Sequence, residues 1–343
     1  MSKSKIGWII KRVAPRLYES ITKRLGKILS YFADSRPFLT DSLGGDFKMY
    51  VNERLNDDIF EDFKKGFDSE SLTVVDALVS RFKNIPNQKV AHNQPSFSIK
   101  ELLPIERNEY SFEMKARLAE LKKVYNGIEW EESVGYFNHG LFFVPTNIKS
   151  ALSDSTALDI GAYVGDSALM LEKVGFKEII SFDISRKSTS KYLENIKRFA
   201  QNSKIFKHEL IGLSDENAPA IRLTDDGSAG MSVERKNSGE LSYEVQITTV
   251  DTYCENLQIK PSFIKADMEG FAFRMIKGAK KTIIENKPVL CLAVYHNPEE
   301  FFEIKLLLQK WVPSYKFILR KLTPKTLRNH CHSEVFLIGY HDV

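Results

Sequence analysis

The sequence contains few cysteines and no long apolar segment, and each absence narrows the class of protein. Only three of its 343 residues are cysteines, and Cys254, Cys291 and Cys331 lack the spacing of a disulfide framework or a metal site. We therefore expect the protein in a reducing cytoplasm. The longest apolar runs, such as residues 288–295, are far too short to cross a bilayer. The first such run, at 6–10, ends at two basic residues, so we expect no secretory signal.

The net charge is also small, and it is unevenly distributed along the chain. A formal charge of +4 does not favour nucleic acid as a partner. Residues 1–36, however, contain nine basic and two acidic residues, a net charge of +7. A basic amphipathic helix at 5–33 could lie on an anionic membrane surface, so this segment is a candidate for peripheral membrane contact. The same pattern also fits a helix that packs on its own protein or on a partner and keeps its basic face in solvent.

The first hundred residues show helical periodicity and no motif that carries chemistry. We expect a mainly helical N-terminal region over 1–100, with helices near 46–66 and 69–83. A polar stretch with two prolines at 84–96 is a candidate linker.

Residues 101–150 are expected to lead into the core of the protein. Their pattern predicts a helix at 106–126, followed by a hairpin with strands at 129–136 and 141–144. His139 would occupy the turn of that hairpin. At a turn it would either contact a substrate or simply be exposed.

From residue 151 onward, apolar strands alternate with helical segments. This alternation indicates an α/β fold built on an open, mostly parallel sheet. The expected strands are 157–160, 178–184, 204–213, 263–267, 289–295, 315–322 and 334–340. A stretch rich in glycine and serine at 225–239 is expected to be a loop that closes over a site.

The stretch Thr156–Ser167 has the pattern of a buried strand that ends in a glycine-rich bend before a helix. Such a bend is a common way to hold a nucleotide-like cofactor. Gly161 and Gly165 can adopt backbone angles closed to other residues, and Asp159 can accept hydrogen bonds from a ligand. A dinucleotide requires a middle glycine, but Tyr163 stands at that position and blocks the close approach of a pyrophosphate.

A cofactor without a pyrophosphate, such as S-adenosylmethionine, fits these residues. Its ribose would lie against Asp183, an acid that ends the second expected strand. Asp183 lies 24 residues beyond Asp159, close to the spacing of roughly 20 residues at which an acid meets a ribose. The methionine part would lie against the bend between Gly161 and Gly165.

Polar residues also follow the other expected strands, at the edge of the sheet where ligands bind. They are Asp159, Asp183, Ser214, Asp267 with Glu269, and Tyr295 with His296. Asp267, Glu269 and His296 could in principle form a metal site with two carboxylates and one histidine. Alternate residues at a strand end point in opposite directions, so we expect no metal.

The combination and order of several motifs resemble the FkbM family of S-adenosylmethionine-dependent methyltransferases over about residues 135–340. The motifs are His-Gly-Leu-Phe-Phe-Val-Pro (139–145), Asp-Ile-Gly-Ala-Tyr-Val-Gly-Asp-Ser (159–167), Lys-Ala-Asp-Met-Glu-Gly (265–270), Lys-Gly-Ala (277–279), Lys-Pro (287–288) and Val-Tyr-His (294–296). The resemblance implies a Rossmann-like methyltransferase domain at 151–343. Its seven strands would have the order 3-2-1-4-5-7-6, with the last strand antiparallel. It also implies S-adenosylmethionine as cofactor and methyl transfer to a hydroxyl oxygen on sugars, polyketides or lipid-linked glycans.

The resemblance, carried over by position, also suggests a set of site residues. The expected cofactor-binding residues are Asp159, Gly161, Tyr163, Gly165, Asp166, Ser167, Asp183, Ser214 and Asp267. The expected catalytic residues are His296, Asp267 and Glu269. His296 is the first choice for the base that takes the hydroxyl proton, because an unperturbed histidine pKa of about 6.5 suits neutral pH.

Two positions depart from the family pattern. Tyr163 stands where the family usually has asparagine, and Ala272 stands where its Asp-x-Glu-Gly-x-Glu motif ends in an acid. We predict an O-methyltransferase that modifies a sugar, glycan or glycolipid precursor in the cytoplasm. The alternative is a catalytically weakened methyltransferase fold that docks a partner or a membrane through residues 1–150.

Overall fold

The computed structural model describes residues 37–38, 42–84, 90–91, 103–107, 110–224, 242–324 and 332–342. The basic helix expected at 5–33, the loop expected at 225–239 and most of the linker expected at 84–96 lie outside these residues. Within the described part, no helix is both long and apolar enough to span a bilayer.

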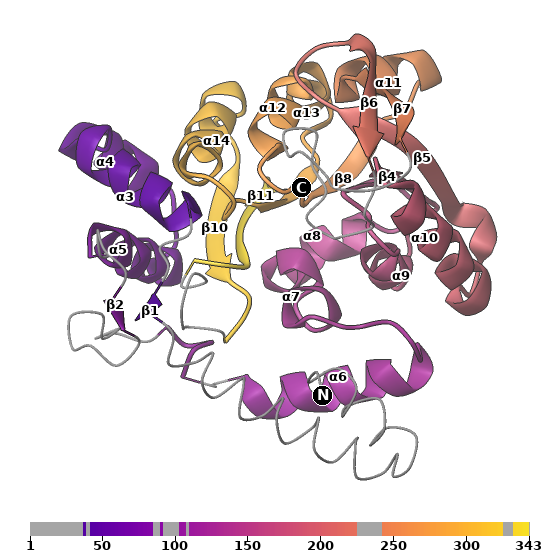
Figure 1. Ribbon diagram of the computed structural model, residues 1–343, viewed down its shortest axis with the longest axis horizontal. Coiled ribbons are helices and arrows are strands. Elements are labelled where there is room, and N and C mark those ends of the chain that lie inside the picture. Colours follow the sequence, from indigo (N-terminus) through magenta and orange to yellow (C-terminus); the bar gives the residue numbers. More distant parts are fainter. Residues whose placement is uncertain are drawn as a thin grey trace, which may run out of the picture.

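A central sheet of nine strands organises the structure (Figure 1). Its order is β10-β11-β9-β8-β3-β4-β5-β7-β6. The strands are β3 (Thr156–Ile160), β4 (Glu178–Asp183), β5 (Phe206–Leu213), β6 (Ala218–Thr224), β7 (Ser242–Thr248), β8 (Pro261–Ala266), β9 (Val289–Ala293), β10 (Lys316–Lys321) and β11 (Val335–Tyr340). The seven expected strands are present in the expected order 3-2-1-4-5-7-6, read from β5 to β10. The final strand, β11, pairs antiparallel with both its neighbours, as predicted.

The sheet is wider than predicted because β6 and β7 continue it beyond β5. β7 pairs parallel with β5, and β6 pairs antiparallel with β7. Both strands mix polar and apolar residues, and they bury only a small separate cluster around Leu223, Tyr243 and Val245. Strands with so little apolar content give a weak sequence signal, so the sequence does not predict them.

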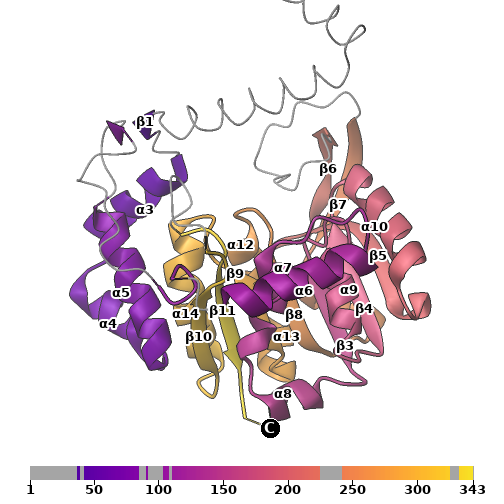
Figure 2. The ribbon, with the colours of Figure 1, turned by 90° about the horizontal axis from the view of Figure 1, so that it is seen from below.

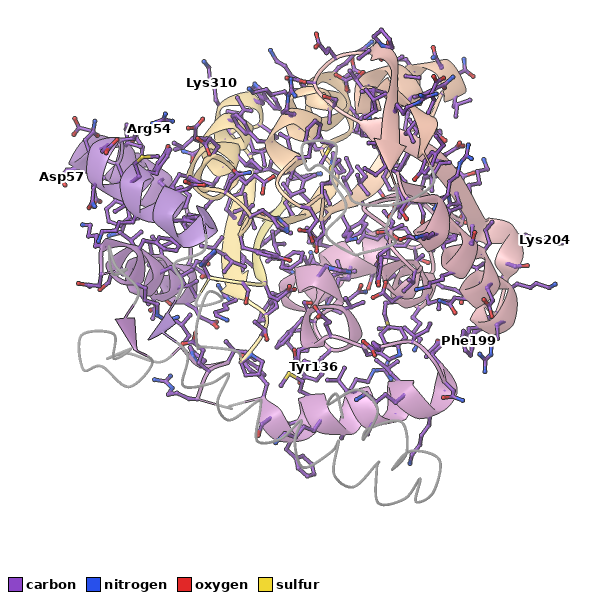
Figure 3. All side chains as sticks on the ribbon, in the orientation of Figure 1. Arg54, Asp57, Tyr136, Phe199, Lys204 and Lys310 are labelled. Atoms are coloured by element: carbon purple, nitrogen blue, oxygen red, sulfur yellow. The ribbon has the colours of Figure 1, made fainter. Side chains whose placement is uncertain are left out.

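Helices cover both faces of the sheet, as an α/β fold requires. Those on one face are α7 (Glu132–Gly135), α9 (Asp166–Glu172) and α10 (Arg186–Phe199) (Figure 1). Those on the other are α11 (Val250–Leu257), α12 (Ala272–Lys277), α13 (Lys280–Asn286) and α14 (Pro298–Trp311). Every residue of β3 and β9 is buried, as expected for strands covered on both sides. Charged side chains such as those of Arg54, Asp57, Lys204 and Lys310 project from the outside of the molecule (Figure 3).

The N-terminal region is helical, as expected, and packs at the β10 end of the sheet (Figures 1 and 2). Its helices are α3 (Ser42–Glu53), α4 (Asp57–Lys64) and α5 (Ser69–Lys83). Asp68 begins α5, where its side chain accepts a hydrogen bond from the Ser71 backbone, and it also pairs with Arg320 of β10 at 2.8 Å. Tyr50 stacks on Phe302 of α14. These helices therefore share one hydrophobic core with the sheet.

The hairpin expected at 129–144 does not form, and this prediction was wrong. The chain instead forms α7 and a 3-10 helix, η2 (Asn138–Phe143), after α6 (Ser111–Val124) and before α8 (Thr146–Ala151). Asn138, His139 and Gly140 all have positive φ angles, which turn the chain too tightly for a strand. The apolar side chains in this segment pack into the core around Phe137 and Leu141. They do not alternate between the two faces of a strand.

A buried ion pair links α5 to the loop that follows it. Both side chains are almost inaccessible, and Arg81 binds Glu106 through two hydrogen bonds of 2.7 and 2.6 Å. Glu106 also accepts a hydrogen bond from the Leu103 backbone amide at 2.9 Å and lies 4.0 Å from Lys321 of β10. Removing one partner of such a pair leaves a buried charge without its counter-ion.

Glu106→Ala should therefore lower the free energy of unfolding by about 3–5 kcal/mol, measured by urea denaturation. Asp62→Ala is the matched control, because it removes the acid of the fully exposed pair Asp62–Lys65 and should leave the unfolding midpoint unchanged. Equal midpoints for the two variants would show that the buried pair does not hold α5 in place.

Candidate active site

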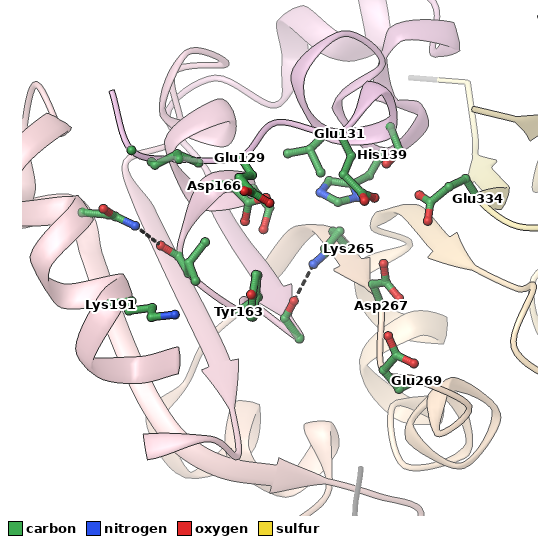
Figure 4. Close-up of a pocket in the computed structure, with 18 of the residues that line it drawn as sticks. Glu129, Glu131, His139, Tyr163, Asp166, Lys191, Lys265, Asp267, Glu269 and Glu334 are labelled. Carbon is green, nitrogen blue, oxygen red and sulfur yellow. Dashed lines mark hydrogen bonds between the residues drawn. The ribbon is translucent and has the colours of Figure 1, made fainter. Parts of the chain in front are cut away.

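A cavity of about 860 Å³ opens at the carboxyl ends of β3, β8 and β9 (Figure 4). In an open α/β sheet this edge is where ligands bind. The cavity is lined by residues 126–134, His139, the bend after β3, the start of α9, α10, the end of β8 with the segment that follows it, Tyr295 and Glu334. Seven acidic side chains face three basic ones: Glu129, Glu131, Asp166, Glu194, Asp267, Glu269 and Glu334 against Lys191, Arg198 and Lys265. The cavity is therefore suited to a ligand with positive charge.

Gly161 begins the bend and has no room for a side chain. Its φ of +73° is in the left-handed region, and a Cβ there would lie 1.8 Å from the carbonyl oxygen of Asp267. The ends of β3 and β8 can therefore approach this closely only with glycine at 161.

Asp159 lies beneath the bend and does not line the cavity. Its Oδ1 is 3.2 Å from Nζ of Lys265, and both side chains are buried. Its Oδ2 accepts hydrogen bonds from the hydroxyl groups of Ser167 and Ser181. The Lys265 ammonium also donates to the carbonyl oxygen of Gly161 at 2.7 Å. Asp159 is thus positioned to hold the bend in place. It is not among the residues that line the cavity.

Asp183 holds the same bend from the β4 side. Its two carboxylate oxygens accept hydrogen bonds from the backbone amides of Tyr163 and Ser185, both at 2.8 Å. Burial raises the pKa of Asp183 to about 6, although these hydrogen bonds oppose the shift. Asp183 does not line the cavity, and its contact with a ribose stays a prediction.

Tyr163 lines the cavity and has a left-handed backbone, with φ of +45°. Asparagine adopts this conformation more readily than tyrosine does, so an asparagine would be less strained at this position. The Tyr163 backbone is held in the strained conformation by its hydrogen bond to Asp183. Strain of this kind, on the order of 1–3 kcal/mol, is common at functional sites.

The start of α9 forms one wall of the cavity. Gly165 is its N-cap with φ of +85°, and a Cβ there would lie 2.9 Å from the ring of Tyr192. Asp166 and Ser167 follow and line the cavity. Burial raises the pKa of Asp166 to about 6, although the Lys265 charge opposes this shift.

The wall opposite α9 is made mainly of carboxylates. Asp267 and Glu269 follow β8, while Glu334 precedes β11 and accepts hydrogen bonds from Tyr295 and Ser133. Burial and the charge of Asp267 raise the pKa of Glu334 to about 7. Sequence reasoning missed Glu334, because no motif marks it and only the β9–β11 pairing brings it next to Tyr295.

His296 is buried behind this wall and does not line the cavity. Its Nε2 lies 3.5 Å from Asp267 and 3.8 Å from Glu269, while its Nδ1 lies 3.5 Å from Glu300. Burial alone would lower the pKa of His296, but its pairing with Glu300 and the charges of Asp267 and Glu269 outweigh burial and raise it to about 9. The ring of His296 is therefore protonated at neutral pH, whereas a general base must be unprotonated to accept a proton. The role of His296 as the base stays a prediction, and its contacts with three carboxylates do not favour it.

Ser214 also lies away from the cavity. Its hydroxyl donates to Asp215 at 2.9 Å, and its carbonyl oxygen lies 2.0 Å from where a Cβ of Gly278 would be. Within the described residues, no group of three or more histidine, cysteine, aspartate and glutamate side chains has a metal-binding arrangement.

His139 lines the cavity, although the sequence placed it in an exposed turn or at a substrate. It is only 4% exposed, and neither ring nitrogen has a hydrogen-bond partner among the described residues. Leaving a buried polar group unpaired costs about 1–3 kcal/mol. Burial, with a smaller effect from the charge of Lys265, holds the pKa of His139 well below its usual value, so the ring is neutral.

The close approach between Gly161 and the Asp267 carbonyl can be tested by comparison with Gly66, a glycine that also has a left-handed backbone but has open space where a Cβ would lie. Gly66 has φ of +79° and nothing within 4 Å of an added Cβ. Gly66→Ala should cost about 1–2 kcal/mol, the cost of a left-handed alanine. Gly161→Ala should cost about 1–3 kcal/mol more, because the Asp267 carbonyl must move. Urea denaturation of both variants measures the difference, and equal losses would rule out the steric role of Gly161.

The protonated state of His296 predicts a pH-dependent contribution to stability. Because the folded pKa of about 9 lies above the ordinary 6.5, this contribution is complete below pH 6.5 and is lost as the pH rises through 9. The stability difference between the native protein and His296→Gln should therefore shrink by about 3 kcal/mol across that range. Denaturation at several pH values measures it. A difference that does not change with pH would show that the ring is not protonated in the folded state.

Comparison with known proteins agrees with this geometry. Residues 159–329 match the model of the methyltransferase FkbM domain. The crystal structure of methyltransferase FkbM from Methylobacillus flagellatus KT is similar, with a TM-score of 0.55 and 20% identity over 86% of this chain and 61% of that chain. This chain thus spans about three fifths of the length of that protein.

More distant matches include an rRNA methylase from Streptococcus thermophilus, with a TM-score of 0.37 and 8% identity over 63% of this chain and 99% of that chain. A precorrin-6y C5,15-methyltransferase from Geobacter metallireducens GS-15 has a TM-score of 0.34 and 12% identity over 57% of this chain and 86% of that chain. A search of the curated proteins gave no match. The glycine bend, the strand order and the matched domain model agree that residues 159–329 form a domain of the FkbM methyltransferase type.

Proposed function

We propose that this protein transfers a methyl group from S-adenosylmethionine to a hydroxyl oxygen of a sugar, glycan or glycolipid precursor. The observation that supports this most is the acidic cavity at the carboxyl ends of β3 and β8. S-adenosylmethionine has a sulfonium and an ammonium group against one carboxylate, so it is a cation at neutral pH. Opposite charges across a partly buried cavity favour binding.

The residues around the bend fit this cofactor. Gly161 brings the main chain of the bend to the cavity wall, and Tyr163 also lines the cavity and offers it an aromatic side chain. Asp166 and Asp267 would face the cationic groups from opposite walls. When bound, the cofactor supplies an electrophilic methyl group on a positively charged sulfur.

The rest of the cavity can orient a hydroxylated acceptor. Carboxylates accept hydrogen bonds from hydroxyl groups, and Asp267, Glu269 and Glu334 lie together on one wall (Figure 4). Holding a hydroxyl oxygen in line with the methyl group supplies about 7–11 kcal/mol of the required rate acceleration. The protein's main task is thus to position two reactants while water is excluded.

The departure at Ala272 does not remove negative charge from this part of the structure. The carboxylate of Glu300 on α14 accepts a hydrogen bond from the backbone amide of Ala272 at 2.7 Å and is fully buried. The alternative reading, a docking module without activity, therefore gains no support at this position. Membrane contact through residues 1–36 stays a prediction, since that segment lies outside the described residues.

Cofactor binding is tested by calorimetry with S-adenosylmethionine on the native protein and on Asp267→Asn. The variant should bind about tenfold more weakly, because one of the charges facing the cationic ligand is lost. Glu299→Gln is the matched control, since Glu299 is an exposed acid on α14 that does not line the cavity, and its affinity should equal that of the native protein. No heat with the native protein at millimolar cofactor would refute the cofactor assignment.

The reaction is tested by incubating the full chain with methyl-tritiated S-adenosylmethionine and polar and lipid extracts of the source cells. Radiolabel should be recovered as O-methyl sugar after acid hydrolysis of the product. Label recovered only on nitrogen, or no label transferred while the cofactor binds, would contradict the hydroxyl acceptor.

A further inference from the structure

His139 is held rigidly where the chain turns toward the cavity. Its backbone has φ of 53° and ψ of 26°, an uncommon left-handed conformation for a residue with a side chain. The next residue, Gly140, has a φ of +100°, and a Cβ there would lie 2.7 Å from the side chain of Ile338 in β11. The turn is therefore pressed onto the sheet and cannot move aside to relieve the strain. Strain that a fold retains in this way is a sign of function.

The ring of His139 points into the cavity from the η2 side (Figure 4). It lies near Glu131, Lys265 and Glu334, and its ring centre is 5.5 Å from that of Phe336. Neither nitrogen is hydrogen-bonded within the described part of the chain. A buried imidazole with two unused nitrogens, at the wall of a cavity, is arranged for a ligand to complete its hydrogen bonds.

We propose that His139 is the residue that takes the proton from the acceptor hydroxyl, an assignment that rests on the proposed methyl transfer. The hydroxyl oxygen forms a bond to the methyl carbon while the bond from that carbon to sulfur breaks. The electron pair of the broken bond stays on sulfur, which becomes a neutral thioether. The hydroxyl proton moves to a ring nitrogen of His139, so charge and atoms balance.

The charges around His139 suit this step. Lys265 of β8 faces the ring and, together with burial, keeps it neutral before the reaction. Glu131, Asp267 and Glu334 also line the cavity, and their carboxylates can stabilise the imidazolium that forms. His296, in contrast, is excluded from the cavity and is surrounded by Asp267, Glu269 and Glu300.

The chain offers a matched control in His208 of β5. Burial lowers its pKa to about 4, and its Nε2 has no hydrogen-bond partner within the described residues. It packs against the ring of Tyr192 and does not line the cavity. A general effect of replacing a neutral, at least partly buried histidine should therefore appear at 208 as well as at 139, whereas a catalytic effect should occur only at 139.

The kinetic experiment compares His139→Gln and His208→Gln in the full chain, with labelled S-adenosylmethionine and the extract fraction that the native protein methylates. His139→Gln should lower kcat by about 10²–10⁴-fold, the usual contribution of a general base. Its KM for the cofactor should stay within about threefold, and His208→Gln should change neither constant beyond that. A native kcat in His139→Gln overturns the assignment while leaving the proposed function intact. If the native protein methylates no fraction, the proposed function fails and the assignment falls with it.

A second measurement needs no acceptor. Diethyl pyrocarbonate acylates neutral imidazole, and peptide mass spectrometry locates the modified residues. At pH 7 His139 should react through the cavity, with His341 at the surface as the internal positive control. If His341 reacts and His139 does not, a reagent smaller than a sugar cannot reach the ring, and the assignment is overturned.

Discussion

The buried ion pair between Asp159 and Lys265 connects the two central strands of the sheet directly below the cavity. The two residues are register partners on β3 and β8, and both are essentially inaccessible to solvent. Burying two charges is favourable only when both are paired and hydrogen-bonded. Lys265 meets this condition by donating to the Gly161 carbonyl, and Asp159 by accepting from Ser167 at the start of α9. The position of the bend and the start of the helix therefore both depend on this pair.

The same pair also sets the electrostatics of the site. Burial lowers the pKa of His139 and the Lys265 charge lowers it further, while the same charge opposes the upward shifts that burial imposes on Asp166 and Asp183. One buried cation thus favours a neutral histidine and ionised carboxylates around a single cavity. A cationic cofactor and a proton acceptor can be accommodated together only with this distribution of charge.

The sequence was sufficient to predict the seven core strands, because β3, β4, β8 and β9 are apolar runs separated by helical segments. The order of these strands was implied by the resemblance to the FkbM family, and the structure has that order. It was also sufficient to locate the bend, because Gly161 and Gly165 mark it directly. It was not sufficient for β6 and β7, whose sequence patterns are weak, because β7 joins the sheet through β5 and β6 joins it through β7. The hairpin around His139 was predicted wrongly because spacing alone cannot distinguish alternation in a strand from packing in a tight helical turn.

The placement of the candidate site residues shows the same limit. Motif position suggested that Asp159 and Asp183 contact a ligand, yet both use their oxygens to hold the bend from below. An acidic side chain at the end of a strand can point toward the ligand or back into the loop, and the sequence does not distinguish these two orientations. Glu334 and His139 line the cavity because tertiary contacts bring β11 and η2 to β9. Their local sequence does not show that they meet there.

The two histidines illustrate how neighbouring groups separate identical side chains into different roles. His296 is surrounded by carboxylates from two elements, so its proton is retained and its positive charge offsets theirs next to the cavity. Glu300 of α14 accepts a hydrogen bond from the Ala272 amide and lies 3.5 Å from the His296 ring. A carboxylate therefore lies next to position 272 although the residue there is alanine. With His296 engaged in that cluster, the unpaired ring of His139 is the imidazole that remains available to a ligand in the described cavity.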